Sequence, residues 1–242
     1  RLSASRQLNT QDGEAFLLNR LYNYAQSPRL GSDLIEAFSV YWGGIYDLEG
    51  VRETISQDDM QRMMEWFIHD YHTGSDRRYV IDLFIETQTA GLPEEALEVL
   101  QAWAQSTMGA FRVQEFPVGD TLDVYDLFRQ EAFEVHSLAL AHNAQKGDIL
   151  VGRLFELGGV KLLTSTTMLL PADYEPGLLE YVHNAYNNYR SDHYQATWDQ
   201  FLRAYGYIFN AYMLSPKAEA LRALIGPGTR FHDPAISRDK LR

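Results

Sequence analysis

Three side chains in this sequence would suit acid–base or metal chemistry if the fold brought them together: His69, Asp70 and His136. His69 and Asp70 form a dipeptide on an expected helix, and an imidazole next to a carboxylate can bind a divalent metal ion. Hydrolases that use such a dipeptide need a further histidine upstream, and no histidine precedes His69. We therefore expect no metal site, no cofactor and no catalytic residue. The alternative is a hydrolase or small-ligand enzyme with these three side chains at the junction of a helical region and a β-barrel.

Motifs of the common catalytic classes are missing from the chain. It contains no G-x-S-x-G nucleophile elbow, no phosphate-binding glycine pattern and no cysteine. Paired carboxylates occur at 58–59 and 94–95, where acidic residues favour the first turn of a helix. Asp123 and Asp126 are three residues apart on an expected strand, so we predict that they point to opposite faces.

The charge balance argues against nucleic acid as the partner. The chain of 242 residues has 21 Lys and Arg against 33 Asp and Glu, a formal charge of −12. Residues 1–108 alone carry 8 basic and 17 acidic side chains, which gives −9. Nucleic-acid affinity comes mainly from Lys and Arg that neutralise phosphates. Only an exposed basic stripe would reverse this expectation, and its members would be Arg112, Arg129, Arg153 and Lys161.

The absence of cysteine excludes disulfides and thiolate chemistry and fits a cytoplasmic protein. No apolar run reaches the roughly 18 residues of a membrane helix. The first ten residues contain no apolar core of a signal peptide. The chain does not begin with methionine, which leaves its native N-terminus open.

Apolar residues at helical spacing predict five helices before residue 108, over residues 10–24, 30–41, 57–71, 79–89 and 94–107. Ser56 is the expected N-cap of the third helix. After Gly109 the period changes to two, and five strands are expected within 110–116, 121–128, 132–137, 148–157 and 160–169. "KGD" at 146–148 and "LGG" at 157–159 supply turns. Two further helices are expected over 176–190 and 191–214.

These elements predict an α+β protein in four regions. An acidic helical region spans 1–108, and a small five-stranded antiparallel β-unit of the SH3-like or OB-like barrel type spans 109–170. A Tyr-rich helical pair spans 171–225, and an extended tail spans 226–242. A β-unit that is apolar on both faces is covered on both sides. We therefore expect it to hold the helical flanks through contacts and to carry no chemistry.

Several segments together resemble a known group of proteins: "WFIHDY" at 66–71, "DLFIE" at 82–86, Leu100, Trp103, and "EAFEVHSLALAHNAQKGDILVGRL" at 131–154. The order is similar to that of bacterial proteins in which a helical unit leads into a small β-unit. In many of them a SEC-C motif follows, the Cys-rich zinc ligand set also found at the end of the SecA translocase. Because the present chain has no cysteine, the resemblance implies an architecture and no zinc site.

Tyrosines are the most distinctive feature of the C-terminal region. Eight of the fifteen lie between Tyr174 and Tyr212. Tyr186, Tyr189 and Tyr207 fall outside the main helical stripe, so we expect some of these rings to face a partner. The sequence thus predicts a non-enzymatic cytoplasmic interaction or regulatory protein that contacts another protein or a second copy of itself.

Overall fold

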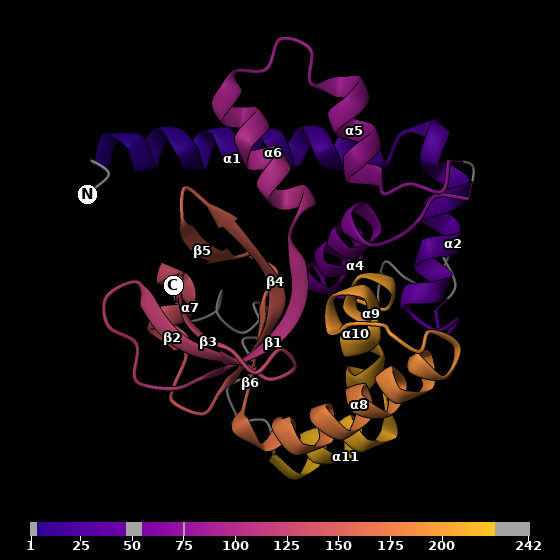
Figure 1. Ribbon diagram of the computed structural model, residues 1–242, viewed down its shortest axis with the longest axis vertical. Helices are drawn as coiled ribbons and strands as arrows, with labels where there is room; N and C mark the ends of the chain where they lie inside the picture. Colours follow the sequence, from indigo (N-terminus) through magenta and orange to yellow (C-terminus); the bar gives the residue numbers. More distant parts are fainter. Residues whose placement is uncertain (1–3, 47–54, 75, 226–242) are drawn as a thin grey trace, which may run out of the picture. The chain divides into compact units, whose positions relative to one another are not determined.

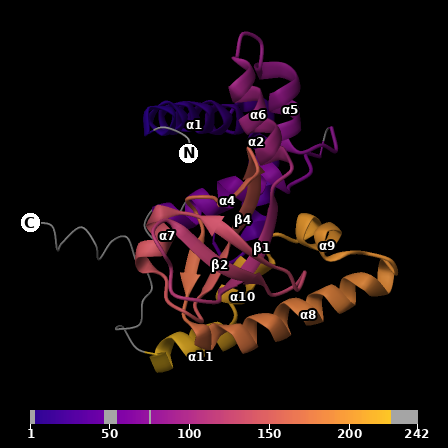
Figure 2. The same cartoon turned by 60° about the vertical axis from the view of Figure 1, so that its left-hand side comes forward.

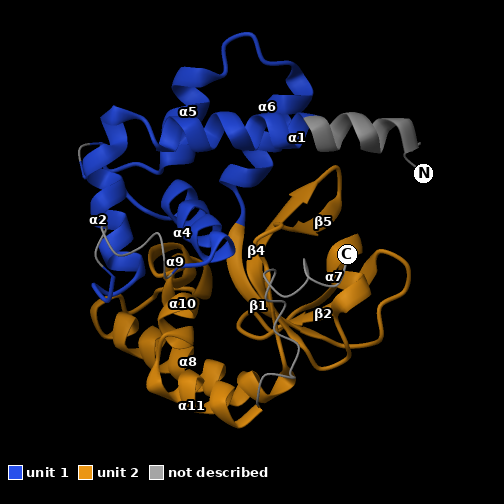
Figure 3. Ribbon diagram, turned by 180° about the vertical axis from the view of Figure 1, so that it is seen from behind, with its two compact units in different colours: residues 1–106 blue, residues 107–242 orange. Residues whose placement is uncertain are grey.

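The computed structural model describes residues 4–46, 55–74 and 76–225, with side chains from residue 13 onwards. The chain divides into two compact units, residues 1–106 and residues 107–242 (Figure 3). The four-region division expected from the sequence stays a prediction, and the expected tail at 226–242 lies outside the described residues. The α+β fold class is confirmed: helices come first, a sheet that curls into a ring follows, and further helices continue up to residue 225 (Figure 1).

The first unit contains the helices that the 3.6-residue spacing predicted. They are α1 (Ala4–Ala25), α2 (Gly31–Tyr41), α4 (Gln57–His69), α5 (Val80–Gln88) and α6 (Glu94–Ala104). The short 3-10 helix η1 (Pro28–Leu30) between α1 and α2 was not predicted. Ser56 caps α4 as expected, because its Oγ accepts a hydrogen bond of 3.1 Å from the Asp59 backbone N–H. Helix α1 packs on α5 and α6, and α4 packs on α2 and α5.

Buried tyrosine hydroxyls should make the protein sensitive to alkali. Burial, and next the carboxylate of Glu65, raise the pKa of Tyr22 to about 12. The pKa of an unfolded tyrosine is about 10, so the unfolded state ionises first as the pH rises. The stabilising effect is complete below about pH 10 and is lost as the pH approaches about 12.

Tyr22→Phe is therefore expected to reduce this alkaline loss of stability by an amount on the order of 1 kcal/mol. Urea unfolding of parent and variant at about pH 9 and about pH 11 measures the difference. Tyr194→Phe is the matched control, because that ring is 81% exposed. An identical alkaline loss in the parent and in Tyr22→Phe would contradict the assignment.

The sheet of the second unit has six strands, one more than the sequence predicted. They are β1 (Thr107–Val113), β2 (Thr121–Asp126), β3 (Ala132–His136), β4 (Ile149–Leu157), β5 (Val160–Leu163) and β6 (Met168–Leu170). The expected last strand is two strands, because residues 164–167 form a turn. The Thr167 N–H and hydroxyl both donate to the Thr164 carbonyl, at 3.1 and 2.7 Å. Both resulting strands pair with β4.

The strands close into a ring in the order β1-β2-β3-β5-β4-β1. All neighbours are antiparallel except β3 and β5, which run parallel and meet at His136 and Leu162, so the expectation of a wholly antiparallel unit was wrong for that pair. Helix α7 (Leu138–Asn143) lies between β3 and β4 in sequence. This strand order, with a helix between β3 and β4, is that of an OB-like barrel.

The glycines of the barrel mark its tightest points. Gly158 and Gly159 form the two-residue turn between β4 and β5 with φ of 59° and 79°, which glycine adopts without strain. Gly152 on β4 faces Gly109 on β1. A Cβ at Gly152 would lie 2.2 Å from the Thr167 Oγ1, so the turn between β5 and β6 packs directly on that backbone.

Gly152→Ala is accordingly expected to lower the free energy of unfolding by about 1–3 kcal/mol through overpacking. Thr167→Ala in the same chain should recover part of the loss, since it removes the Oγ1 that the new methyl group would strike. Gly13→Ala is the control, because a Cβ added there would meet nothing within 4 Å and alanine favours a helix. Equal stability of parent and Gly152→Ala in urea unfolding would refute the close approach.

The C-terminal helices are more broken than the sequence predicted. They are η2 (Ala172–Tyr174), α8 (Glu175–Asp192), α9 (Trp198–Ala204), α10 (Ile208–Met213) and α11 (Pro216–Ile225). The single helix expected over 191–214 is wrong: Thr197 and Gln200 form a capping box that starts a new helix. A turn at residues 205–207 then separates α9 from α10.

Two apolar clusters fill the second unit. One lies inside the ring and includes Phe111, Leu122, Val124 and Val135, with Leu140 of α7 packed against it. The other joins the outer face of the barrel to α8, α9 and α10. Helix α7 and the C-terminal helices cover different sides of the barrel (Figures 1 and 2). The barrel is filled inside and packed outside, as its apolar strands indicated.

Candidate functional site

His69, Asp70 and His136 do not come from one element or from one unit. His69 ends α4 in the first unit, Asp70 is the C-cap residue of the same helix, and both are buried. His136 ends β3 in the second unit, with its Nδ1 3.8 Å from the Asp120 Oδ2. The catalytic role of the three side chains stays a prediction. Within the described part of the chain, no three His, Asp or Glu side chains gather so that they could hold a metal ion.

The four residues of the hypothetical basic stripe have separate surroundings. Arg153 is only 1% exposed. Arg112 pairs with Glu175 at 2.7 Å and lies over the ring of Tyr125. The Lys161 ammonium lies 4.1 Å from the centre of the Phe133 ring. Since Arg153 is buried and Arg112 is paired, these residues offer little free positive charge to a phosphate backbone.

Tyr186 on α8 is a core residue. Its ring stacks on Trp198 with 3.8 Å between the centroids, and its hydroxyl donates a 2.7 Å hydrogen bond to the Ala196 carbonyl. The hydrogen bond attaches the loop between α8 and α9 to α8, and the ring contact attaches the first residue of α9 to it. The side chain is buried, so its substitution would disturb packing before it disturbed any surface.

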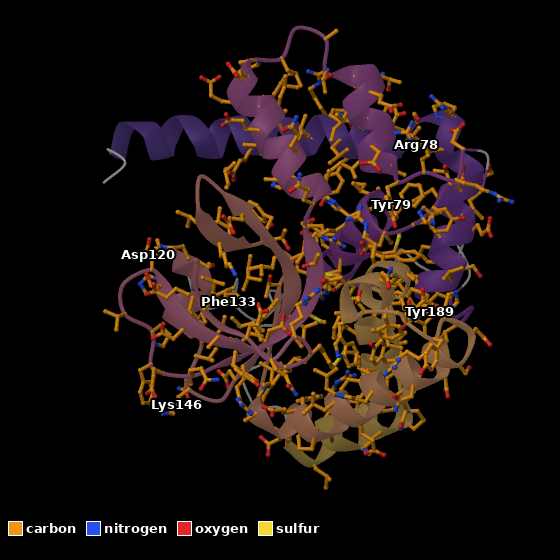
Figure 4. All side chains as sticks on the ribbon, in the orientation of Figure 1. Arg78, Tyr79, Asp120, Phe133, Lys146 and Tyr189 are labelled. Carbon is orange, nitrogen blue, oxygen red and sulfur yellow. The ribbon has the colours of Figure 1, made fainter. Side chains whose placement is uncertain are left out.

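Tyr189, one turn further along α8, belongs to a group of rings that reaches the surface (Figure 4). It stacks on exposed His193 at 4.1 Å and meets Tyr205 edge-to-face at 5.4 Å. Both Tyr189 and Tyr205 also contact Phe201, which is fully buried. Because the outer rings rest on a buried one, the core fixes their positions.

Tyr207 extends the same group beyond α9. Its ring lies 5.8 Å from that of Tyr205. Burial, and next the neighbouring phenols of Tyr205 and Tyr181, raise the pKa of Tyr207. We call Tyr189, His193, Tyr205 and Tyr207 the aromatic surface. The partner-binding role predicted for Tyr186, Tyr189 and Tyr207 stays a prediction, and only the last two belong to this surface.

An ion-pair network that is buried at one end attaches α9, the helix beneath the aromatic surface, to the barrel. Fully buried Asp126, at the end of β2, accepts hydrogen bonds of 2.9 Å from the backbone N–H groups of Phe128 and Arg129 and from the Arg129 guanidinium. Arg129 also pairs with Asp199 of α9 at 2.7 Å. Burial alone would lower the pKa of Arg129, but Asp126 and Asp199 outweigh it and raise that pKa.

Phe128 makes the matching apolar attachment. Its ring contacts those of Trp198, His183 and Phe209, at centroid distances of 5.0, 5.8 and 5.9 Å. Sequence reasoning recognised that Asp123 and Asp126 face opposite ways, which is confirmed, because Asp123 is exposed. It missed the network. An Asp followed at the third position by Arg, directly after a strand, is a turn signal that would have drawn attention to it.

Tyrosine makes up most of the aromatic surface. Tyrosine rings bury a large area while keeping a polar hydroxyl, which is why they are enriched at protein interfaces. Among the helices that the structure describes, none combines the length and the apolar character that a membrane-spanning segment requires.

Comparison with known proteins places the chain in one family. Residues 50–206 match the model of DUF7986, a family of unknown function. The matched region takes in part of the first unit and most of the second, from before α4 to the end of α9. No curated protein and no solved structure matches the chain.

Proposed function

Because the chain belongs to the DUF7986 family, whose function is unknown, we propose a function from its geometry: it is a non-enzymatic cytoplasmic interaction or regulatory protein. Its aromatic surface contacts a protein partner, which is either a different protein or a second copy of this chain. The family match includes Tyr189, His193 and Tyr205, so most of this surface lies within the family region.

One observation carries the proposal: the partly exposed rings are fixed to the core. Tyr189 and Tyr205 both rest on buried Phe201, and His193 stacks on Tyr189. A rigid aromatic side chain loses little conformational entropy when a partner covers it, so the cost of ordering these rings on binding is small.

The resemblance noted in the sequence bears on the architecture of the protein and not on its partner. We propose that the chain is related to the bacterial helix-plus-barrel proteins that often carry a C-terminal SEC-C motif. The present sequence has no cysteine for that motif.

The test is affinity purification of the tagged chain from lysate of its native organism, with nuclease added and proteins identified by mass spectrometry. The parent chain is expected to retain a stoichiometric protein partner, and the double variant Tyr189→Ala, Tyr207→Ala to lose it. Tyr194→Ala is the matched control, because that ring is exposed and lies outside the aromatic surface. Circular dichroism confirms that each variant is folded.

If the double variant retained the partner as well as the parent chain does, the partner would bind at a site other than the aromatic surface. Sedimentation of the purified chain reports self-association as a separate result. A monomer that binds no protein but holds a small molecule would contradict the proposal and favour the enzyme alternative.

A further inference from the structure

The loop between β1 and β2 exposes apolar side chains that the aromatic surface does not include. Phe116 is 70% exposed and Val118 is 80% exposed, both within residues 115–120. Leu138, the first residue of α7, is 61% exposed. Large apolar side chains exposed together on a folded protein mark a contact site more often than isolated ones do.

Both ends of this loop are fastened to the ends of α7. At one end, the Lys146 ammonium pairs with the Glu115 carboxylate at 2.9 Å, just beyond the C-terminus of the helix. At the other, the Ser137 N–H donates to the Asp120 carbonyl at 2.8 Å, just before its N-terminus. Figure 4 labels Asp120 and Lys146 at the outer edge of the barrel.

Helix α7 has six residues and is thus about 9 Å long. The loop is tied near both ends of this helix, so the exposed side chains of Phe116, Val118 and Leu138 belong to one edge of the barrel. We call these three residues the barrel-edge patch.

Carboxylates lie on the strands that adjoin this loop. Asp123 on β2 lies directly opposite Glu134 on β3, and both are exposed. Asp120, at the loop end, is on the same side of these strands. Like charges directly opposite each other across two strands destabilise a sheet. The barrel therefore carries an unfavourable pair where a basic ligand would relieve the repulsion.

From this arrangement we propose that the barrel-edge patch binds a short peptide segment of another protein, in which an apolar anchor is flanked by Lys or Arg. The anchor covers Phe116, Val118 and Leu138, and the basic side chains pair with Asp120, Asp123 and Glu134. Complementary charge at the rim of an apolar contact raises the association rate and fixes the register. This site is separate from the aromatic surface, and either can fail without the other.

A displayed library of random dodecapeptides, selected on the full chain, tests the proposal. Enriched peptides are expected to combine Leu, Ile or Phe with neighbouring Lys or Arg. A synthetic peptide of the enriched sequence should bind the parent chain about tenfold more tightly than Val118→Ser, Leu138→Ser, which removes apolar area without adding charge. Ile45→Ser is the matched control, since Ile45 is similarly exposed in the other unit and its loss should leave binding unchanged.

Enrichment of acidic or uncharged peptides, equal binding to the double variant, or no enrichment at all would overturn the proposal. Tighter binding of an oligothymidine probe than of the selected peptide, lost in the same double variant, would overturn it in favour of nucleic acid.

Glu134→Gln gives a second test, because it should increase the stability of the free chain and decrease its affinity for the peptide. Removing one of two facing carboxylates is expected to raise the Tm of the free chain while weakening the selected peptide several-fold, most strongly at low salt. A lower Tm, or peptide binding that neither this change nor salt affects, would show that the carboxylates do not form the rim of the site.

Discussion

Asp126→Ala is expected to lower the free energy of unfolding by about 3–5 kcal/mol, the usual cost of breaking a buried ion pair from one side. The fully buried carboxylate accepts two backbone N–H groups and the Arg129 guanidinium. Its removal leaves those donors without their acceptor in the interior, and Arg129 keeps only the exposed carboxylate of Asp199 as a charged partner. Urea unfolding followed by circular dichroism measures the loss.

Asp123→Ala is the matched control, because it removes the same side chain from the same strand at an exposed position. We expect it to change stability by less than about 0.5 kcal/mol, or to increase it slightly by relieving the repulsion from Glu134. If the two alanine variants lost similar stability, the hydrogen bonds of Asp126 would not hold the turn after β2.

The second large effect is expected at Phe128, whose deletion to alanine should cost about 3–5 kcal/mol. The buried ring lies among Trp198, His183 and Phe209, so its loss empties the contact between the barrel and helices α8, α9 and α10. We also expect weaker near-ultraviolet circular dichroism, because Trp198 loses a packed neighbour. Thermal and urea unfolding give the stability, and the near-ultraviolet spectrum at low denaturant gives the local effect.

Phe116→Ala is the control for this change, because it removes the same ring from an exposed loop. Its expected effect on stability is within about 0.5 kcal/mol. A near-neutral Phe128→Ala would mean that the barrel and the C-terminal helices are not joined through this ring.

Local patterns predicted the elements of this protein well. Apolar residues at helical spacing located α4, α5 and α6, and Ser56 with acidic residues after it marked the start of α4. Period-two alternation located the strands and showed that Asp123 and Asp126 face opposite ways. Each of these features depends on residues within a few positions of one another, which a single sequence displays directly.

Features that depend on distant residues escaped prediction. The pairing of Arg129 with Asp199 and the contact of Phe128 with Trp198 each join residues 70 positions apart. Burial of Tyr186 follows from the fold-back of residues around Trp198, which helical spacing alone does not reveal. The split of the last expected strand arises because Thr167 bonds back to Thr164 and packs on Gly152. The periodicity of apolar side chains along the sequence does not indicate a tertiary contact of this kind.

The central structural claim about the second unit is that the barrel holds the Tyr-rich helices α8, α9 and α10 in place. If the barrel holds the helices, the aromatic surface is formed before any partner binds, and affinity does not bear the cost of ordering it. Substitutions at Asp126, Arg129 or Phe128 would then change partner binding only indirectly. They would shift α9 and the aromatic rings next to it.

Native-state hydrogen exchange of the unmodified chain, read by mass spectrometry, tests this relation most directly. The opening free energies of α8 and α9 are expected to equal those of β1 and β4, because one cooperative unit exposes its amides together. Exchange of α8 and α9 at a much lower opening free energy than the barrel strands would contradict it, since the helices would then unfold while the barrel stayed intact.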